Sequence, residues 1–547
     1  MNRSEDSVAS SAAGSASLFT DRWLLGALAA ALALRLPGLA AAPLWFDETI
    51  TAEWMHLSWA ELLKTVLTDN HPPLYFLLLR GWTELAGHSD FALRLPSALA
   101  SLACVPLMAA AARLAAGDAA MRWAAWFAAL SPLLIHHGQE ARAYAVIALL
   151  ATSHFLLVLR FLQSDSRRLR WGFGLTGAML AWTHYYSAVF VAAQLLTVLV
   201  AAPRRWRQWL PGAVIASAGC SSAALAAMVY AQREAGGGYE LGPAATAGVL
   251  WGLLTEYTLL PSSEELHAHG VPAAWRYLPA ALLAALCVVP LAWWGLQRLK
   301  PQLRVAALAS IAAVVIVPYA ISLVMAVGSH PRYASPALAP MLLVMTAAIC
   351  HPRRRRLARV ALAGVALLMV IASGRHLVDP GHGREDVRGA QAWLRDHFGP
   401  SGEVVVMSEE MAQLARFHWP ERSVRTYPRP RLMVTPDNAA ELAEQLPLAE
   451  GKAVFVIGRE WVADPKELLE RELRRRYAQC GEHNVRGIRI LCLTKTVPLS
   501  ASLPYTNQPR PAQQGDPARW NQGSAGGDRF LLTQTGHGHS LDARAPN

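Results

Sequence analysis

Two adjacent carboxylates, Asp47 and Glu48, follow the first long apolar segment of the sequence. A carboxylate can act as a general base in catalysis. A simpler interpretation is also open, because carboxylates in the first turn of a helix are stabilised by the positive end of the helix dipole. His71 lies in the same polar stretch, so a divalent metal ion held by Asp47, Glu48 and His71 is compatible with the sequence, although no cofactor is required.

Further ionisable side chains lie where later apolar segments begin. Glu140, Arg142 and Tyr144 stand at the start of one such segment, and Arg332 stands shortly before another. Ionisable residues at a membrane boundary are costly and are therefore functional candidates, although Glu140 and Arg142 could instead form an internal pair that locks two helices. An arginine suits a phosphate through its charge and its planar fork of donors. Carboxylates together with arginines indicate chemistry on a phosphate-bearing lipid.

The composition shows which elements must position these side chains. Of the 547 residues, 53% are hydrophobic and 16% are charged, and the mean hydropathy is +0.24. Many apolar residues come in blocks of about 20, the length at which a helix crosses a bilayer. The net charge of +11 comes from short basic runs between these blocks, as in cytoplasmic loops, and does not indicate nucleic-acid binding. The sequence therefore predicts a multi-pass protein of the cell inner (plasma) membrane, in contact with membrane lipids.

Four basic clusters, around 167–170, 204–207, 298–304 and 353–356, set the topology when all are placed in the cytoplasm. The chain then crosses the membrane about eleven times, with the N-terminus inside and the C-terminal region outside. Residues 171–202 must form two short spans, because one long span would put a basic cluster on the wrong side. The predicted spans are 23–42, 91–114, 121–135, 143–163, 171–184, 187–202, 208–230, 275–297, 305–327, 335–350 and 357–373.

The topology also divides the chain into parts. The expected parts are a flexible cytoplasmic N-terminus (1–20), a transmembrane domain (21–375) with external loops at about 43–90 and 231–274, an external domain (380–500) and a disordered tail (501–547). In the external domain, β-rich runs at 403–407, 424–427, 453–458 and 488–493 alternate with helical patterns at 409–417, 438–445 and 465–477. This alternation predicts a small α/β domain. Cys480 and Cys492 could pair there in an oxidising compartment, or remain two buried free thiols.

Several short motifs together resemble the bacterial branch of the protein O-mannosyltransferase superfamily, whose relatives include the lipid A aminoarabinose transferases. The resemblance covers about 20–495 and depends on the order and spacing of the motifs. The motifs are Phe46–Asp47–Glu48, His71–Pro72–Pro73–Leu74–Tyr75, Gln139–Glu140–Ala141–Arg142–Ala143–Tyr144, Thr183–His184–Tyr185, Arg332–Tyr333 and Arg384–Glu385–Asp386–Val387–Arg388–Gly389–Ala390. This resemblance implies the type C glycosyltransferase fold.

The resemblance also implies a sugar donor carried on a polyprenyl phosphate and a hydroxyl acceptor outside the cytoplasm. Asp47 matches the first-loop aspartate, and we expect limited hydration to raise its pKa toward that of a useful base. Glu48 and Glu140 join it as catalytic candidates, and Arg332 is expected to meet the lipid phosphate. His71 stands where the aminoarabinose transferases have a lysine, which puts a phosphate contact from this position in doubt. The expected substrate-binding residues are His71, Tyr75, Arg142, Tyr144, His184, Tyr185, Arg332 and Tyr333.

We interpret the protein as an inverting glycosyltransferase that acts on lipopolysaccharide or lipid A, a cell-wall glycan, or a protein. A transporter or flippase for a lipid-linked sugar is a rival interpretation, which internal repeats would favour; we find none in the sequence. An oligosaccharide polymerase or ligase with a lipid-diphosphate donor is a second rival. The sequence has no glycine-rich phosphate loop, so no nucleotide sugar is expected to bind.

Overall fold

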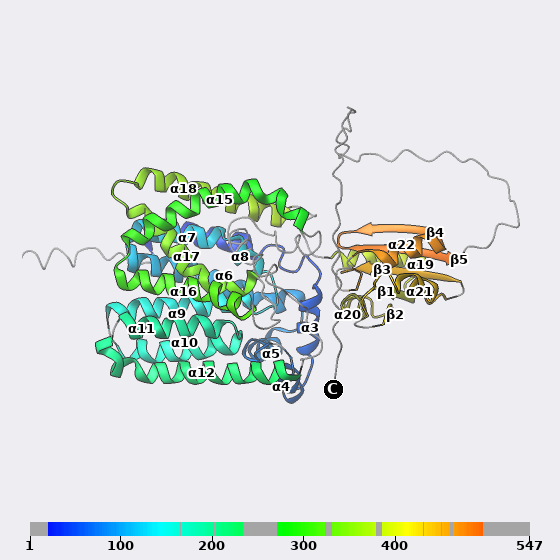
Figure 1. Cartoon of the computed structure of the whole chain (residues 1–547), viewed down its shortest axis with the longest axis horizontal. Helices are drawn as coiled ribbons and strands as arrows, with labels where there is room; N and C mark the ends of the chain where they lie inside the picture. Colours follow the sequence, from blue (N-terminus) through cyan, green and yellow to red (C-terminus); the bar gives the residue numbers. More distant parts are fainter. Residues whose placement is uncertain are drawn as a thin grey trace, which may run out of the picture. The chain divides into compact units, whose positions relative to one another are not determined.

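The computed structural model describes residues 20–495, apart from 234–270, 323–330, 379–384 and short gaps at 70, 165, 202, 430–431, 450, 460–462 and 465. The expected N-terminal segment, most of the loop at 231–274 and the expected tail lie outside the described residues. The described chain consists of a large helical part that ends with α18 and a smaller part that contains a β-sheet (Figure 1).

The helical part contains a helix at each of the eleven predicted spans. These are α2 (Arg22–Arg35), α6 (Asp90–Ala116), α7 (Asp118–Leu130), α9 (Tyr144–Gln163), α10 (Arg167–Thr183), α11 (Ser187–Ala201), α12 (Trp206–Arg233), α15 (Val271–Arg298), α16 (Pro301–Ser322), η3 with α17 (Pro331–Ala337 and Leu338–Ala347) and α18 (Arg355–Val378). Seven helices in the described chain are long and apolar enough to cross a membrane. The stretch 171–202 forms two helices, α10 and α11, as predicted. This is a multi-pass membrane protein.

Small residues allow two of these helices to approach closely. A Cβ atom added to Gly212 of α12 would lie 2.2 Å from the carbonyl oxygen of Arg170 in α10, and one added to Gly174 would lie 2.8 Å from the carbonyl oxygen of Gly212. Glycine is therefore needed at both positions. Such small-residue contacts are how helices associate in lipid, where apolar side chains gain nothing by leaving the solvent.

A buried arginine explains the charge at the end of the first apolar segment. Arg35 of α2 donates from Nη1 to the carbonyl oxygen of Ala129 (2.8 Å), from Nη2 to that of Ala128 (2.9 Å) and from Nε to Ser101 (2.7 Å). The last carbonyl groups of a helix lack partners within it and carry partial negative charge, and Arg35 satisfies two of them in α7. It thereby fixes the point from which α8 (Pro132–Gly138) leads toward Glu140.

The segment between α2 and α6, which the sequence predicts to be an external loop, is helical and has a core of its own. It contains α3 (Phe46–Trp54), α4 (Trp59–Leu67) and α5 (Leu74–Ala86). Their apolar sides pack together around buried Met55, Phe76 and Leu79. This core gives the residues of α3 a fixed backbone, although they lie outside the predicted spans.

The smaller part has a five-stranded sheet in the order β2-β1-β3-β5-β4. Its strands are β1 (Gly402–Val406), β2 (Arg422–Thr426), β3 (Lys452–Gly458), β4 (Tyr477–Val485) and β5 (Ile488–Lys495), and its helices are α19 (Val387–Phe398), α20 (Glu409–His418), α21 (Ala439–Glu444) and α22 (Leu468–Arg476). Strands β1, β2 and β3 are parallel, whereas β5 runs antiparallel to both β3 and β4.

The edge strand β4 is missing from the sequence prediction. None of its residues is buried, and apolar and polar residues do not alternate regularly along it, so the strand lacks the pattern that marks a half-buried strand. The predicted helix at 465–477 ends at Arg476, where β4 begins. A disulfide bond joins Cys480 of β4 to Cys492 of β5, between strands that are already paired.

Candidate active site

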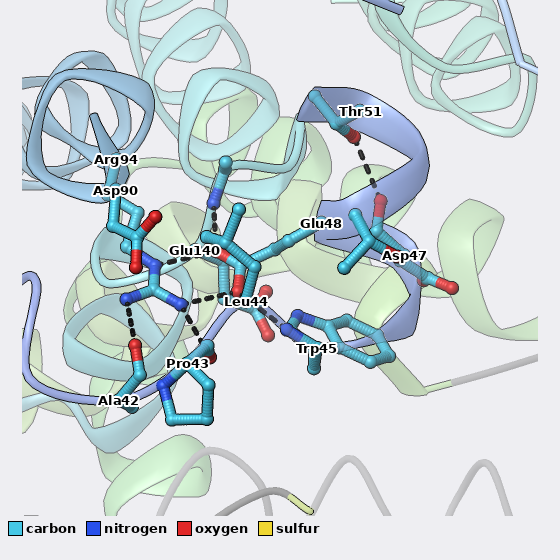
Figure 2. A network of polar contacts seen from close by, with 12 residues as sticks. Ala42, Pro43, Leu44, Trp45, Asp47, Glu48, Thr51, Asp90, Arg94 and Glu140 are labelled. Carbon is cyan, nitrogen blue, oxygen red and sulfur yellow. Dashed lines mark hydrogen bonds and ion pairs between the residues drawn. The ribbon is translucent and has the colours of Figure 1, made fainter. Parts of the chain in front are cut away.

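Helix α3 presents Asp47 and Glu48 in different directions. Successive residues of an α-helix are rotated by about 100° around its axis, so adjacent carboxylates cannot face the same partner. Figure 2 shows Glu48 pointing toward Arg94 while Asp47 points away from it. The two carboxylates look alike in the sequence, but their side chains lie in different environments.

Glu48 is fully buried and forms an ion pair with Arg94 of α6. Both carboxylate oxygens accept from the guanidinium, Oε1 from Nε at 2.7 Å and Oε2 from Nη2 at 2.6 Å. Oε1 also accepts from the backbone N–H of Ala141 at 2.7 Å, and Oε2 accepts from that of Trp45 at 3.3 Å (Figure 2). Because both carboxylate oxygens already accept hydrogen bonds, Glu48 does not serve as a metal ligand together with Asp47 and His71. The capping interpretation holds for Glu48, and we correct its assignment as a catalytic residue.

Asp47 faces two guanidinium groups that come from distant segments. Its Oδ2 lies 3.7 Å from Nη2 of Arg142, which precedes α9, and 3.7 Å from Nη1 of Arg332 in η3. These separations exceed hydrogen-bond length, so the contacts are ion pairs without a hydrogen bond. The side chains of Asp47 and Arg332 are 17% and 25% exposed, which leaves the cluster accessible to a ligand.

The charges around Asp47 reverse the expected shift of its pKa. Burial raises the pKa of Asp47, but the nearby side chains, chiefly the positive guanidinium groups of Arg142, Arg332 and Arg459, outweigh it and hold the pKa below its ordinary value. Asp47 is therefore ionised at neutral pH. The expectation of a raised pKa is wrong, because it considered only hydration and not the arginines that other segments bring to the site.

His71 joins this cluster as a bridge. Its Nδ1 lies 2.7 Å from Asp69 Oδ2, and its Nε2 lies 2.9 Å from Nη2 of Arg142. Burial and the Arg142 charge lower the pKa of His71, although Asp69 acts in the opposite direction, so the ring is neutral at neutral pH. Nδ1–H then donates to Asp69 and Nε2 accepts from Arg142. His71 thus orients Arg142.

Aromatic rings lie against the other side of the arginine cluster. The Arg332 guanidinium stands 5.1 Å from the ring centroid of Tyr144 and 5.8 Å from that of Tyr333, within the range of cation–π contacts. His184 and Tyr186 lie 4.8 and 5.2 Å from the Tyr333 ring. The structure therefore gathers Tyr144, His184 and Tyr333 as the motifs suggest.

Two predicted binding residues contribute differently from what the motifs suggest. Tyr75 is near Arg142, but it is only 3% exposed and packs against Phe76 in the core formed by α3, α4 and α5. Tyr185 is half-exposed, and its neighbour Tyr186 makes the stacked contact with Tyr333. The direction in which the chain turns between α10 and α11 decides which tyrosine faces the cluster, and sequence spacing does not reveal it.

Glu140 lies beside two histidines. His136 Nε2 is 3.1 Å from Glu140 Oε1, and His137 Nδ1 is 3.0 Å from Oε2. Within the described chain, these three residues form a group whose donor atoms lie close enough to hold a metal ion. Two imidazoles and a carboxylate are ligands that Zn²⁺ accepts. The donor set differs from the expected one of Asp47, Glu48 and His71.

The chain is similar to known proteins in sequence and in fold. Residues 70–230 match the sequence model of a family described as dolichyl-phosphate-mannose-protein mannosyltransferase. No curated protein matches the sequence. The structure is similar to that of ArnT from Cupriavidus metallidurans in the apo state, with a TM-score of 0.50 and 12% identity, over 86% of this chain and 97% of that one.

Two further structures are similar at lower scores. ArnT from Cupriavidus metallidurans bound to undecaprenyl phosphate has a TM-score of 0.48 and 13% identity, over 86% of this chain and 98% of that one. The oligosaccharyltransferase AglB from Archaeoglobus fulgidus, in complex with an inhibitory peptide and a dolichol-phosphate, has a TM-score of 0.47 and 11% identity, over 87% and 74%.

The family match and the fold agree with the resemblance that the motifs carry. The fold is that of ArnT, mostly helical with a small C-terminal sheet, as the motifs predict. The matched segment includes Glu140, Arg142 and Tyr144 of the site. These findings support the resemblance of the motifs to that superfamily, and the fold is the one that the resemblance implies.

The buried ion pair gives a test of the site's construction. Glu48→Gln keeps the shape of the side chain but leaves the Arg94 charge buried without a carboxylate. Breaking such a pair costs about 3–5 kcal/mol, so the melting temperature in detergent should fall markedly. Glu53→Gln, at an exposed position of the same helix, is the control and should melt like the wild type. Equal melting temperatures for both variants would contradict a supporting role for Glu48.

Proposed function

We propose that the protein transfers a sugar from a polyprenyl-phosphate carrier to a hydroxyl group of an acceptor outside the cytoplasm. The observation that carries the proposal is the ionised Asp47 carboxylate 3.7 Å from two guanidinium groups. Such a site offers a proton acceptor and an anion-binding group within one small space. Transfer of a sugar from a phosphate carrier needs both at once.

The reaction can be written with these residues in definite roles. The acceptor hydroxyl gives its proton to the Asp47 carboxylate as its oxygen forms a bond to the anomeric carbon. The bond between that carbon and the phosphate oxygen breaks on the opposite face, and polyprenyl phosphate leaves with its electron pair. Arg332 and Arg142 stabilise the charge that gathers on the leaving phosphate. The anomeric configuration is inverted.

The low pKa of Asp47 is consistent with this sequence of events. In the free site the arginine charges favour the ionised carboxylate and weaken it as a base. A phosphate bound to Arg142 and Arg332 adds a negative charge beside Asp47 and raises its pKa. Donor binding thus strengthens the base, and the acceptor is deprotonated only when a donor is present.

The class of donor and acceptor is part of the proposal. The matched family is described by a lipid-phosphate sugar donor, dolichyl-phosphate-mannose, and the site offers charge for such a phosphate. The acceptors that fit an external site are lipopolysaccharide or lipid A, a cell-wall glycan, or a protein. An oligosaccharide polymerase or ligase remains the nearest rival, and the sugar found on the product distinguishes it.

Transfer can be measured before the sugar is known. Membranes of a deletion strain supply the native donor and acceptor, and purified protein added to them should change the glycans, as followed by mass spectrometry. Single sugars added to the acceptor support the proposal. Addition of whole oligosaccharides, or no change at all with active membranes, contradicts it.

Arg332→Lys tests the contact with the phosphate. Lysine keeps the charge but loses the planar fork, so the transfer rate should fall while folding survives. Arg160→Lys, at the exposed C-terminal end of α9, is the matched control and should leave transfer unchanged. Transfer by Arg332→Lys at the wild-type rate would show that Arg332 serves only as a charge at the membrane surface.

Asp47→Asn tests the base. Asparagine keeps the shape of the side chain but cannot take the proton, and general base catalysis contributes about 10²–10⁴-fold, so transfer should fall at least about a hundredfold. The melting temperature should change little. A variant that is destabilised but transfers sugar near the wild-type rate would mean that Asp47 only caps its helix.

A further inference from the structure

The residue after β3 has an unusual backbone conformation. Arg459 follows Gly458 at the carboxyl end of the strand and has a φ of 54°. Only one other residue of the described chain that is not glycine, Glu467, has a positive φ. This left-handed region is unfavourable for a side chain with a Cβ atom. Such conformations persist only where the surroundings impose them, and they gather at functional sites.

The Arg459 side chain reaches the start of α3. Its guanidinium lies 4.9 Å from the ring centroid of Phe46, the first residue of that helix. On its other side, Nη1 donates to Glu385 Oε1 at 3.0 Å. Both partners of this ion pair are largely buried, at 15% and 11% exposure. The guanidinium is therefore held between a carboxylate of its own domain and the residue that precedes Asp47.

Other contacts attach the same domain to the same region independently of Arg459. His418 Nε2 lies 2.7 Å from the carbonyl oxygen of Leu44, and Gln413 donates to Glu53 at 3.2 Å. Arg388 donates to the carbonyl oxygen of Ala41 at 2.9 Å and to Asp90 at 3.0 Å. Loss of the Arg459 contact would leave these attachments in place, so Arg459 is not required to hold the domain there.

We propose that the C-terminal domain completes the active site through Arg459, a positioning residue that orients the first turn of α3 through Phe46 and adds a positive charge to the surroundings of Asp47. The proposal builds on the proposed function. It gives this domain a part in sugar transfer that neither the motifs nor the family match, which ends at residue 230, indicates.

The charges that face Asp47 agree with this role. Arg142 reaches it from the segment before α9, Arg332 from η3 and His71 from the segment before α5, while Arg459 alone among these groups comes from the C-terminal domain. Burial raises the pKa of Asp47, and these groups, Arg459 among them, lower it. Glu48, on the same helix, faces Arg94. The α20 side chain that contacts α3, Gln413, is neutral and bonds to Glu53.

Three variants distinguish the orientation of α3 by Arg459 from the mere attachment of the C-terminal domain. Arg459→Ala removes the ring contact and the charge, Arg459→Lys keeps the charge without the planar group, and Arg388→Ala removes a docking contact of the same domain. The transfer rate in membranes of the deletion strain should fall about tenfold to a hundredfold in Arg459→Ala, the effect of a small misplacement at a reacting group. Arg459→Lys should recover part of the rate, and Arg388→Ala should stay near the wild type.

The pH profile supplies a readout that docking alone would not change. With fewer positive charges beside Asp47, the acid limb of kcat/KM should move to higher pH in Arg459→Ala but not in Arg388→Ala. Equal losses of rate in both variants with unmoved acid limbs would overturn the proposal, as would wild-type behaviour of Arg459→Ala. If Arg459→Ala fails to fold, the test uses Arg459→Lys alone. A wild-type transfer rate and acid limb in Arg459→Lys would show that only the charge of Arg459 matters and would overturn the role of its contact with the Phe46 ring. Absence of transfer by the wild-type protein would instead refute the proposed function.

Discussion

The ion pair between Glu48 and Arg94 is the interaction on which the site depends. Arg94 extends from α6 and also donates to the carbonyl oxygens of Leu39, Ala42 and Pro43, in the segment that enters α3. Glu48 in turn accepts from the backbone of Ala141, one residue before Arg142. One buried pair thus joins the first loop, a membrane helix and the segment that carries Arg142. Once Glu48 is held in this way, the rotation of α3 about its axis is fixed, and the Asp47 side chain faces Arg142 and Arg332.

Burying such an ion pair has a large desolvation free energy, so its presence calls for an explanation other than stability. Removing two charges from water costs several kcal/mol each, and a buried pair often stabilises a protein no more than apolar residues would. Its hydrogen bonds are directional, however, whereas apolar contacts allow an element to slide or rotate. We infer that the pair serves to fix the register of α3 relative to α6. The site needs this register because Asp47 meets its partners through ion pairs that do not themselves constrain it.

The sequence predicts those residues of the site that can be recognised from their immediate neighbours in the chain. Asp47, Arg142 and Arg332 are found because ionisable residues at the ends of apolar segments are costly unless they have a use. The same rule could have identified Arg94, which lies in the first turns of an apolar helix. The eleven helices follow from segment length and loop charge.

Other parts depend on which distant residues meet, and no local pattern contains that information. Asp47 and Glu48 look alike in the sequence, and only the rotation of α3 separates their roles. The sign of the Asp47 pKa shift depends on residues from four segments up to 412 positions away. Strand β4 has no buried residue because it is an edge strand, and Arg459 follows a strand in a domain that the motifs barely cover.

In the proposed reaction, the arginines around Asp47 bind the phosphate of the donor, and this binding strengthens Asp47 as the base. The most direct measurement compares the acid limbs of the pH profiles of kcat/KM and kcat for the wild-type protein. The first reports the free enzyme and the second the donor complex. If donor binding raises the pKa of Asp47, the acid limb of kcat lies at higher pH than that of kcat/KM. An acid limb of kcat at the same or lower pH would contradict it.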